Sequence, residues 1–170
     1  DKPDPMEGPY FEETIYVTPS RLSDSQQVEL SKVSSAACAA LGLIEGAVHI
    51  ELRVTGSGPV AIEVNPRAIG GLCSDVLRFG TGLTLEELLL NHALGDRAPL
   101  PDRVDRAAGV MMLGVEGGGV LERVEGVEAA EAGAGIERVW ITGQPGQASQ
   151  AWPAGGAYPG CVFAAGSTPG

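Results

Sequence analysis

The stretch VHIELRVTGSGPVAIEVNP, residues 48–66, decides the fold of this chain. Its two ends, residues 48–54 and 60–65, alternate apolar and polar side chains, which is the period of a β-strand with one buried face. Residues 55–59 between them are the turn formers TGSGP. The segment therefore predicts an antiparallel β-hairpin.

Two glutamates are expected to face each other across this hairpin. If the hairpin closes with Val54 opposite Val60, Glu51 lies directly opposite Glu63. Opposed residues of an antiparallel pair have Cβ atoms about 5 Å apart, and like charges at that distance destabilise the sheet. Such a pair is tolerated where solvent, an arginine or a cation lies between the charges. The apolar side chains of the second strand, Val60 and Ile62 among them, are expected to be buried on the other face.

The same register adds an amide to the two carboxylates, because it places Asn65 opposite His49. Carboxylate and amide oxygens are hard ligands of the type that Mg²⁺ prefers, with phosphates and waters completing the octahedron. Glu51, Glu63 and Asn65 are therefore candidate metal ligands. His49 is expected to be a packed or solvated histidine rather than a ligand.

A purely structural interpretation of these residues stays open. Exposed glutamate pairs are common on the solvated face of a sheet. Arg67 follows Asn65 by two residues and can equally serve as the partner that neutralises Glu63.

The segments around the hairpin predict helices and further short strands. Two capping boxes are present, Ser23 with Gln26 and Thr84 with Glu87. They predict a helix over residues 24–41 before Gly42, and a Leu-rich helix that Gly95 ends. A short helix is expected near residues 74–79. The face of the first helix is expected to carry Val28, Val33, Ala37, Ala40 and Leu41. Strands are expected over residues 11–18, 109–115, 139–142 and 161–164.

The domain organisation follows from these elements and from a polar, Pro-containing segment at residues 97–102. We predict an α+β fold with an antiparallel sheet and flanking helices over residues 1–97. A small β-rich domain is expected over residues 98–170, where glycine clusters separate the short strands.

Composition limits the classes of partner. The formal net charge of −11 argues against nucleic acid and against an anionic membrane surface, because both need a basic surface. No apolar run approaches the roughly 18 residues of a spanning helix. The 3 cysteines are far apart and form no CxxC pair, so we expect no disulfide framework or zinc site and a cytoplasmic location. No interface is legible, so the oligomeric state stays open.

The string IEVNPR at residues 62–67, with Glu51 twelve residues before Glu63, resembles the ATP-grasp signature. The match is closest to the carbamoyl-phosphate synthetase, biotin carboxylase and L-amino-acid ligase branches. The resemblance implies that Glu51, Glu63 and Asn65 bind Mg²⁺ (or Mn²⁺) ions against the phosphates of ATP. Residues 1–97 then correspond to the second lobe of the ATP-grasp fold.

The resemblance also implies roles for the residues that follow the signature. Arg67 would stabilise the acyl-phosphate intermediate and the phosphoryl group in transfer, as a catalytic and substrate-binding residue. Gly70 and Gly71 would belong to the substrate-side loop. The implied reaction is ATP-dependent ligation of a small carboxylate to an amine through an acyl phosphate. The family's first lobe, which grips adenine and phosphates, has no counterpart in these residues, so we expect a piece of a longer ligase that is inactive alone.

Two alternatives to a carboxylate–amine ligase stay open. A biotin-carboxylase-like enzyme would carry a Gln-Val-Glu-His type of stretch soon after the arginine, whereas this chain has Ile69–Leu72, IGGL. A non-catalytic module derived from an ATP-grasp protein is the other alternative. Its case is weakened because Glu51, Glu63, Asn65 and Arg67 are all present.

Overall fold

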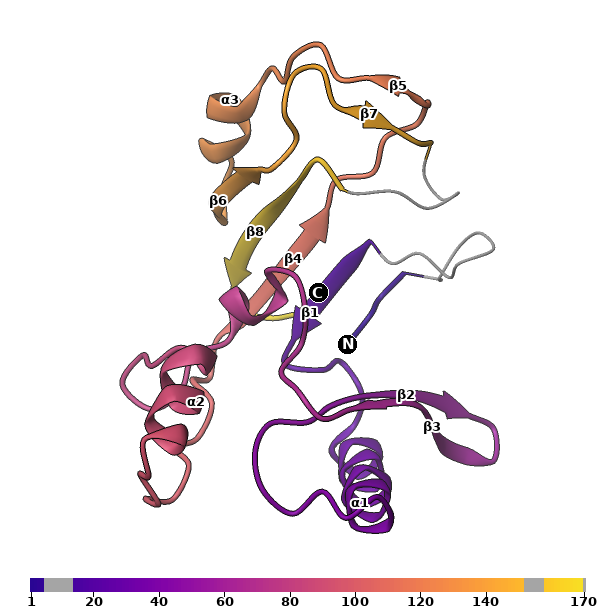
Figure 1. The fold of residues 1–170 in the computed structure, drawn as a ribbon, viewed down its shortest axis with the longest axis vertical. Coiled ribbons are helices and arrows are strands. Elements are labelled where there is room, and N and C mark those ends of the chain that lie inside the picture. The colour runs from indigo at the N-terminus through magenta and orange to yellow at the C-terminus, as the bar shows by residue number, and fades with distance from the viewer. Residues whose placement is uncertain (5–13, 152–157, 170) are drawn as a thin grey trace. The chain divides into compact units, whose positions relative to one another are not determined.

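The computed structural model of the chain describes residues 1–4, 14–151 and 158–169, and combines helices with antiparallel sheets (Figure 1). In chain order the elements are β1 (Ile15–Thr18), α1 (Asp24–Ala40), β2 (His49–Thr55), β3 (Gly58–Asn65), the 3₁₀ helix η1 (Cys73–Val76), α2 (Leu85–Ala93), β4 (Ala107–Met112), β5 (Gly119–Val120), α3 (Val127–Glu131), β6 (Ile136–Ile141), β7 (Ala148–Ser149) and β8 (Gly160–Gly166). This mixture confirms the predicted α+β class.

The chain forms two compact units. One, here called the sheet unit, comprises residues 1–19 and 105–170, and the other, the hairpin unit, comprises residues 20–104. This grouping differs from a division by chain order at residue 97, because the N-terminal strand β1 pairs with β4 and so joins the C-terminal residues.

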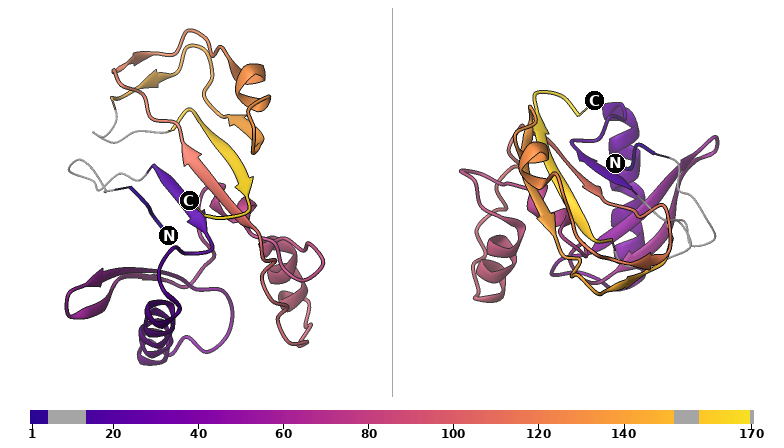
Figure 2. Two further views of the ribbon diagram at one scale, coloured as in Figure 1. Left: turned by 180° about the vertical axis from the view of Figure 1, so that it is seen from behind. Right: turned by 90° about the horizontal axis from the view of Figure 1, so that it is seen from above.

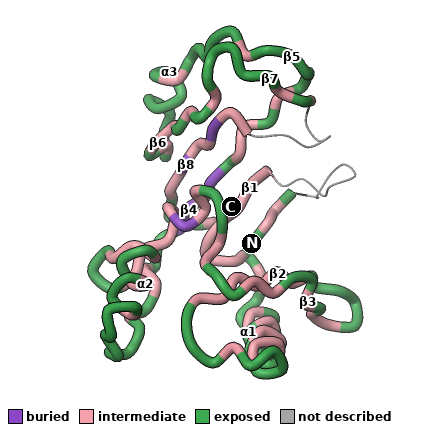
Figure 3. The backbone as a smooth tube through the Cα atoms, viewed as in Figure 1, coloured by how far each residue is buried: buried purple, intermediate pink, exposed green. Residues whose placement is uncertain are grey.

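The sheet unit is built on a four-stranded antiparallel sheet in the order β1-β4-β8-β6 (Figures 1 and 2). Its core lies on the two middle strands, where Val110 of β4 pairs with Phe163 of β8 and both residues are buried. Figure 3 shows the buried stretches of β4 and β8 in purple. The guanidinium of Arg138 lies over the Phe163 ring, 4.2 Å from its centroid. The predicted strands of this region are present as β4, β6 and β8, each beginning one to three residues earlier than expected.

The N-terminal strand is shorter in the described residues than the sequence predicts. β1 covers Ile15–Thr18, while residues 11–13 of the predicted strand lie outside the part of the chain that the structure describes. Its pairing with β4 runs from Ile15 opposite Met111 to Thr18 opposite Ala108.

In the hairpin unit, α1 begins at the predicted residue and ends at Ala40, one residue before the predicted end. Ser23 and Gln26 cap each other's backbone amides reciprocally, and Gly42 follows the helix with φ +70°. The helix packs against β3, and Figure 2 shows it beside the hairpin from behind. The half-buried stripe includes Leu30 and Val33 rather than Val28, which is 52% exposed. Val28 lies two residues from Leu30, roughly 200° around the helix, so the two cannot share a face.

The end of α1 and the segment after the hairpin also differ from the prediction. Ala40 and Leu41 are exposed, because they stand at the last residue and the C-cap, where the helical period ends. The short helix predicted near residues 74–79 is a four-residue 3₁₀ helix, η1.

α2 opens with the predicted Thr84–Glu87 capping box, and Gly95 follows it with φ +97°. Within the described residues, no helix is both long and apolar enough to cross a membrane.

Candidate metal and nucleotide site

The register of the β2–β3 hairpin brings together the predicted site residues. Glu51 pairs directly with Glu63, and His49 pairs with Asn65. Both pairings confirm the register predicted for this end of the hairpin. Since alternate residues of a strand share a face, the two carboxylates, the amide and the imidazole lie on the same face.

The other end of the hairpin differs from the prediction. The turn is tighter than expected, so Val54 pairs with Pro59 rather than with Val60. The register recovers through a β-bulge next to Glu51, which leaves Ile62 as the extra residue of β3. Val60 and Ile62 were expected to be buried, yet they are 51% and 56% exposed. The bulge takes them out of the simple alternation on which that expectation rested.

The imidazole of His49 lies next to the Glu51 carboxylate on the same face of β2. The two side chains are only 19% and 22% exposed, and His49 Nε2 lies 3.9 Å from Glu51 Oε1. His49 Nδ1 and Asn65 Nδ2 are buried and have no hydrogen-bond partner in the described part of the chain. Buried polar atoms without partners are rare in proteins, so these two atoms mark a place where an interaction is still to be made.

Arg67 is held by the turn that follows β3. Its backbone N–H donates to Asn65 O at 2.8 Å, and its Nη1 donates to Ala68 O at 2.9 Å. Across residues 1–4, 14–151 and 158–169, Arg67 forms no ion pair with Glu63. The structural interpretation, in which Arg67 neutralises Glu63, therefore has no contact to support it.

The glycines after Arg67 give the loop its conformation. Gly71 has φ +62°, a left-handed backbone that glycine adopts without strain. A Cβ built on Gly70 would stand 3.8 Å from Arg67 Nη1. The loop is therefore packed closely enough to the guanidinium for a side chain at residue 70 to touch it.

The donor set fits a hard divalent cation as part of its coordination shell. Glu51, Glu63 and Asn65 offer carboxylate and amide oxygens on one face of the hairpin. In the part of the chain that the structure describes, no group of three or more His, Cys, Asp and Glu side chains is arranged to hold a metal ion. The candidate ligands are two carboxylates and one amide, a small set of the kind that suits Mg²⁺ when waters or substrate phosphates complete its shell.

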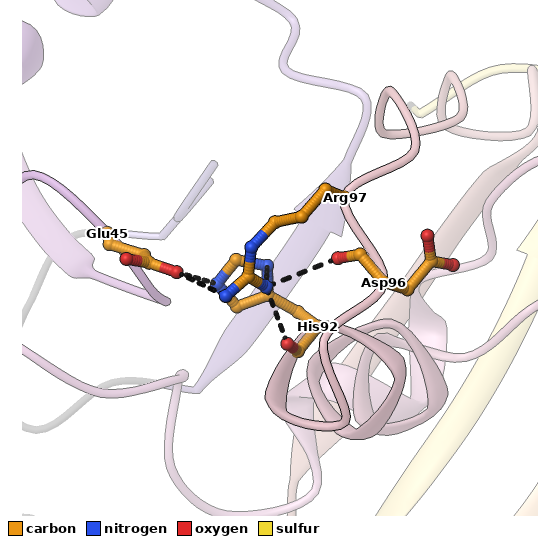
Figure 4. Close-up of polar contacts among 4 residues, drawn as sticks. All are labelled: Glu45, His92, Asp96 and Arg97. Atoms are coloured by element: carbon orange, nitrogen blue, oxygen red, sulfur yellow. Dashed lines mark hydrogen bonds and ion pairs between the residues drawn. The ribbon is translucent and has the colours of Figure 1, made fainter.

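A second polar cluster lies on the hairpin unit, and sequence reasoning did not predict it. Glu45 precedes β2, and its Oε1 lies 3.0 Å from Arg97 Nη2 and 3.2 Å from His92 Nε2 (Figure 4). Arg97 Nη1 also donates to the backbone oxygen of His92 at 2.8 Å. The cluster ties the loop before β2 to the end of α2, and no local pattern could reveal a partner 47 residues away.

Comparisons with known proteins place the chain in a family. A family model described as an ATP-grasp domain matches residues 1–76, and one described as L-amino acid ligase C-terminal domain 2 matches residues 111–170. The chain belongs to the ATP-grasp family. The two models match separate parts of the chain, before and after residues 77–110.

Individual relatives show which branch of the family is similar. Carnosine synthase 1 of Gallus gallus is 35% identical over 134 residues, which are 73% of this chain and 14% of that protein. The crystal structure of an L-amino acid ligase from Bacillus licheniformis matches with a TM-score of 0.80 and 28% identity, covering 95% of this chain and 41% of that one. A biotin carboxylase domain of Hydrogenobacter thermophilus, in complex with MgADP and bicarbonate, shares the fold at 17% identity and a TM-score of 0.61, covering 92% of this chain and 35% of that one. This chain therefore spans less than half the length of these relatives.

Proposed function

We propose that this chain supplies the metal–ATP carboxylates of a ligase that joins a carboxylate to an amine through an acyl phosphate. The observation that carries the proposal is the pairing of Glu51 with Glu63, with Asn65 two residues further on the same face. Two carboxylates in direct opposition destabilise a hairpin unless something positive lies between them. A divalent cation bound to ATP phosphates meets that requirement.

Each residue has a role in this proposal. Glu51, Glu63 and Asn65 would hold Mg²⁺, which when bound neutralises charge on the phosphates during transfer. The guanidinium of Arg67 offers a planar fork of donors to the transferring oxygens. Gly70 and Gly71 would let the loop backbone approach the acceptor carboxylate closely.

The substrate class follows from the relatives that share sequence as well as fold. Their names, an L-amino acid ligase and a carnosine synthase, favour an amino-acid-type carboxylate and amine. The biotin carboxylase domain shares only the fold, and this chain has IGGL at residues 69–72 where that class is expected to carry further polar residues. We propose residues 1–97 as the second ATP-grasp lobe, acting with a first lobe that grips adenine and phosphates, and residues 98–170 as the C-terminal domain.

The metal site is tested by titrating Mn²⁺ into the chain and following free Mn²⁺ by electron paramagnetic resonance, with and without ADP. The comparison is with the double variant Glu51→Gln/Glu63→Gln. Glu116→Gln/Glu122→Gln is the matched control, because both side chains are exposed and the net charge changes equally. We expect Mn²⁺ binding that the control retains and the site variant loses. Equal binding by all three proteins, or none by the wild type, would overturn the hairpin as a metal site.

A further inference from the structure

The two orphaned polar atoms of the hairpin are complementary. His49 Nδ1 and Asn65 Nδ2 are both buried without a hydrogen-bond partner in the described residues, and the residues that carry them are directly paired across the strands. An amide nitrogen is a donor, and an imidazole nitrogen without a proton is an acceptor. Two unsatisfied atoms of opposite kind, on opposed residues, are placed to satisfy each other.

Geometry allows the two atoms to meet without a backbone change. Opposed residues in an antiparallel pair have Cβ atoms about 5 Å apart. Nδ1 and Nδ2 are each separated from their own Cβ by a single carbon. The χ2 angles of the imidazole and the amide have broad minima, so both nitrogens can be reoriented toward each other while the backbone stays fixed.

The second ring nitrogen of His49 lies near another of the proposed metal ligands, Glu51. Nε2 lies 3.9 Å from Glu51 Oε1, on the same face of β2. When Nδ1 accepts from Asn65, the neutral ring carries its proton on Nε2 and can donate to that carboxylate. One imidazole then contacts two of the three proposed metal ligands.

We propose that His49 is a positioning residue that links Asn65 to Glu51. Asn65 Nδ2–H donates to His49 Nδ1, and His49 Nε2–H donates to Glu51 Oε1. The link turns the amide oxygen of Asn65, and the second oxygen of Glu51, toward the cation. Partners of this kind fix the orientation of metal ligands, and their loss typically lowers metal affinity 10- to 100-fold. The effect of this link on metal binding rests on the proposed function, whereas the two hydrogen bonds can form in the hairpin without a metal.

The link is tested directly by nuclear magnetic resonance, because the chain contains only 2 histidines. The chain is labelled with ¹⁵N in its imidazoles and studied in mildly alkaline buffer, and His92→Gln assigns the remaining ring to His49. We expect a single tautomer with the proton on Nε2, and an Nδ1 signal that moves when Asn65 is replaced by Ala. A proton on Nδ1, an even mixture of tautomers, or an Nδ1 signal indifferent to Asn65→Ala would overturn the link.

The effect on metal binding is tested with two substitutions of His49 in the Mn²⁺ titration. His49→Phe keeps a planar ring but removes both nitrogens, and we expect at least about tenfold weaker binding. His49→Gln offers one acceptor and one donor from its amide, and we expect much of the affinity to return, while His92→Gln stays at the wild-type value. Wild-type affinity in His49→Phe would overturn the positioning role, even if Glu51→Gln/Glu63→Gln had lost binding. If the wild type bound no Mn²⁺, the proposed metal site would fail, and the tautomer measurement would still decide the link.

Discussion

Glu51 lies directly opposite Glu63 at the point where the register of the hairpin changes. The turn shifts the pairing near the tip of the hairpin by one residue, so that Val54 pairs with Pro59. The bulge next to Glu51 reverses this shift, so Glu51 still pairs with Glu63. The site and the irregularity are thus adjacent. Bulges next to functional sites commonly serve to aim side chains, and this one keeps Glu63 and Asn65 on the face that carries Glu51.

Removing one charge of this pair should stabilise the fold while it impairs the proposed catalysis. Glu63→Gln relieves the repulsion between opposed carboxylates, so we expect the free energy of unfolding to rise by about 0.5 kcal/mol. In the complete ligase, turnover should fall about a hundredfold or more, because metal-assisted charge stabilisation contributes several kcal/mol. Chemical denaturation and release of ADP measure the two effects.

The control for this variant is Glu116→Gln, which also removes one negative charge from an exposed glutamate. Since the chain carries a net charge of −11, any general relief of repulsion appears in the control as well. The assignment of Glu63 would be contradicted by near-wild-type turnover in Glu63→Gln.

The Glu45 cluster should contribute modest, salt-sensitive stability. Glu45→Gln removes the charge that faces both Arg97 and His92. All three side chains are at least one third exposed, so we expect a loss of about 0.5 to 1 kcal/mol at low ionic strength. Salt at about 1 M shortens the screening length to about 3 Å and should remove most of the difference between variant and wild type.

A urea denaturation series at low and high salt measures this effect, and Glu86→Gln on the same unit is the charge-matched comparison. A loss that persisted unchanged at high salt would point to packing rather than to ion pairs. That result would contradict the electrostatic role assigned to Glu45.

Cys161 should be slow to react with alkylating reagents at neutral pH. Burial raises the pKa of its thiol above the ordinary value of 9.0, and the positive charge of Arg138 opposes that shift only in part. Because the thiolate is the reactive form, the alkylation rate should inflect above pH 9.0 in a Cys38→Ser/Cys73→Ser background. Arg138→Gln should move the inflection higher still, whereas Arg138→Lys should not.

The same shift fixes the sign of a stability effect. The folded chain holds the Cys161 proton more tightly than the unfolded chain, so this contribution to stability is complete below the unfolded pKa. It is lost as pH rises through the folded pKa. Cys161→Ala should therefore reduce the alkaline slope of stability, and an unchanged slope would contradict the assignment.

The sequence predicted the elements whose signals are local. The capping boxes at Ser23 and Thr84 predicted both helix starts, and alternation around Glu51 and Glu63 predicted the register at the end of the hairpin that carries the candidate site. It failed where a distant or irregular partner decides the outcome. The bulge at Ile62 has no local signature, and β1 groups with residues 105–170 through a pairing that no pattern within residues 11–18 could specify.

The loop after Arg67, which is proposed to lie beside the substrate, offers a test that separates backbone strain from contact with the substrate. Gly71→Ala introduces a Cβ where φ is +62°, so we expect a destabilisation of about 1 kcal/mol although no atom within 4 Å opposes the new methyl group. Gly70 has no such backbone constraint, and a Cβ there would stand in ordinary contact, 3.8 Å from Arg67 Nη1. Gly70→Ala should therefore leave the free energy of unfolding nearly unchanged.

The proposed role of the loop predicts that Gly70→Ala, which hardly changes stability, does change the kinetics. In the complete ligase, Gly70→Ala should raise the KM for the carboxylate several-fold, because the methyl group restricts the guanidinium that is proposed to bind the acyl phosphate. Gly71→Asn, whose side chain tolerates a left-handed backbone, should recover the stability lost in Gly71→Ala. An unaltered KM in Gly70→Ala, with turnover also unchanged, would show that neither residue 70 nor its contact with Arg67 belongs to the substrate site.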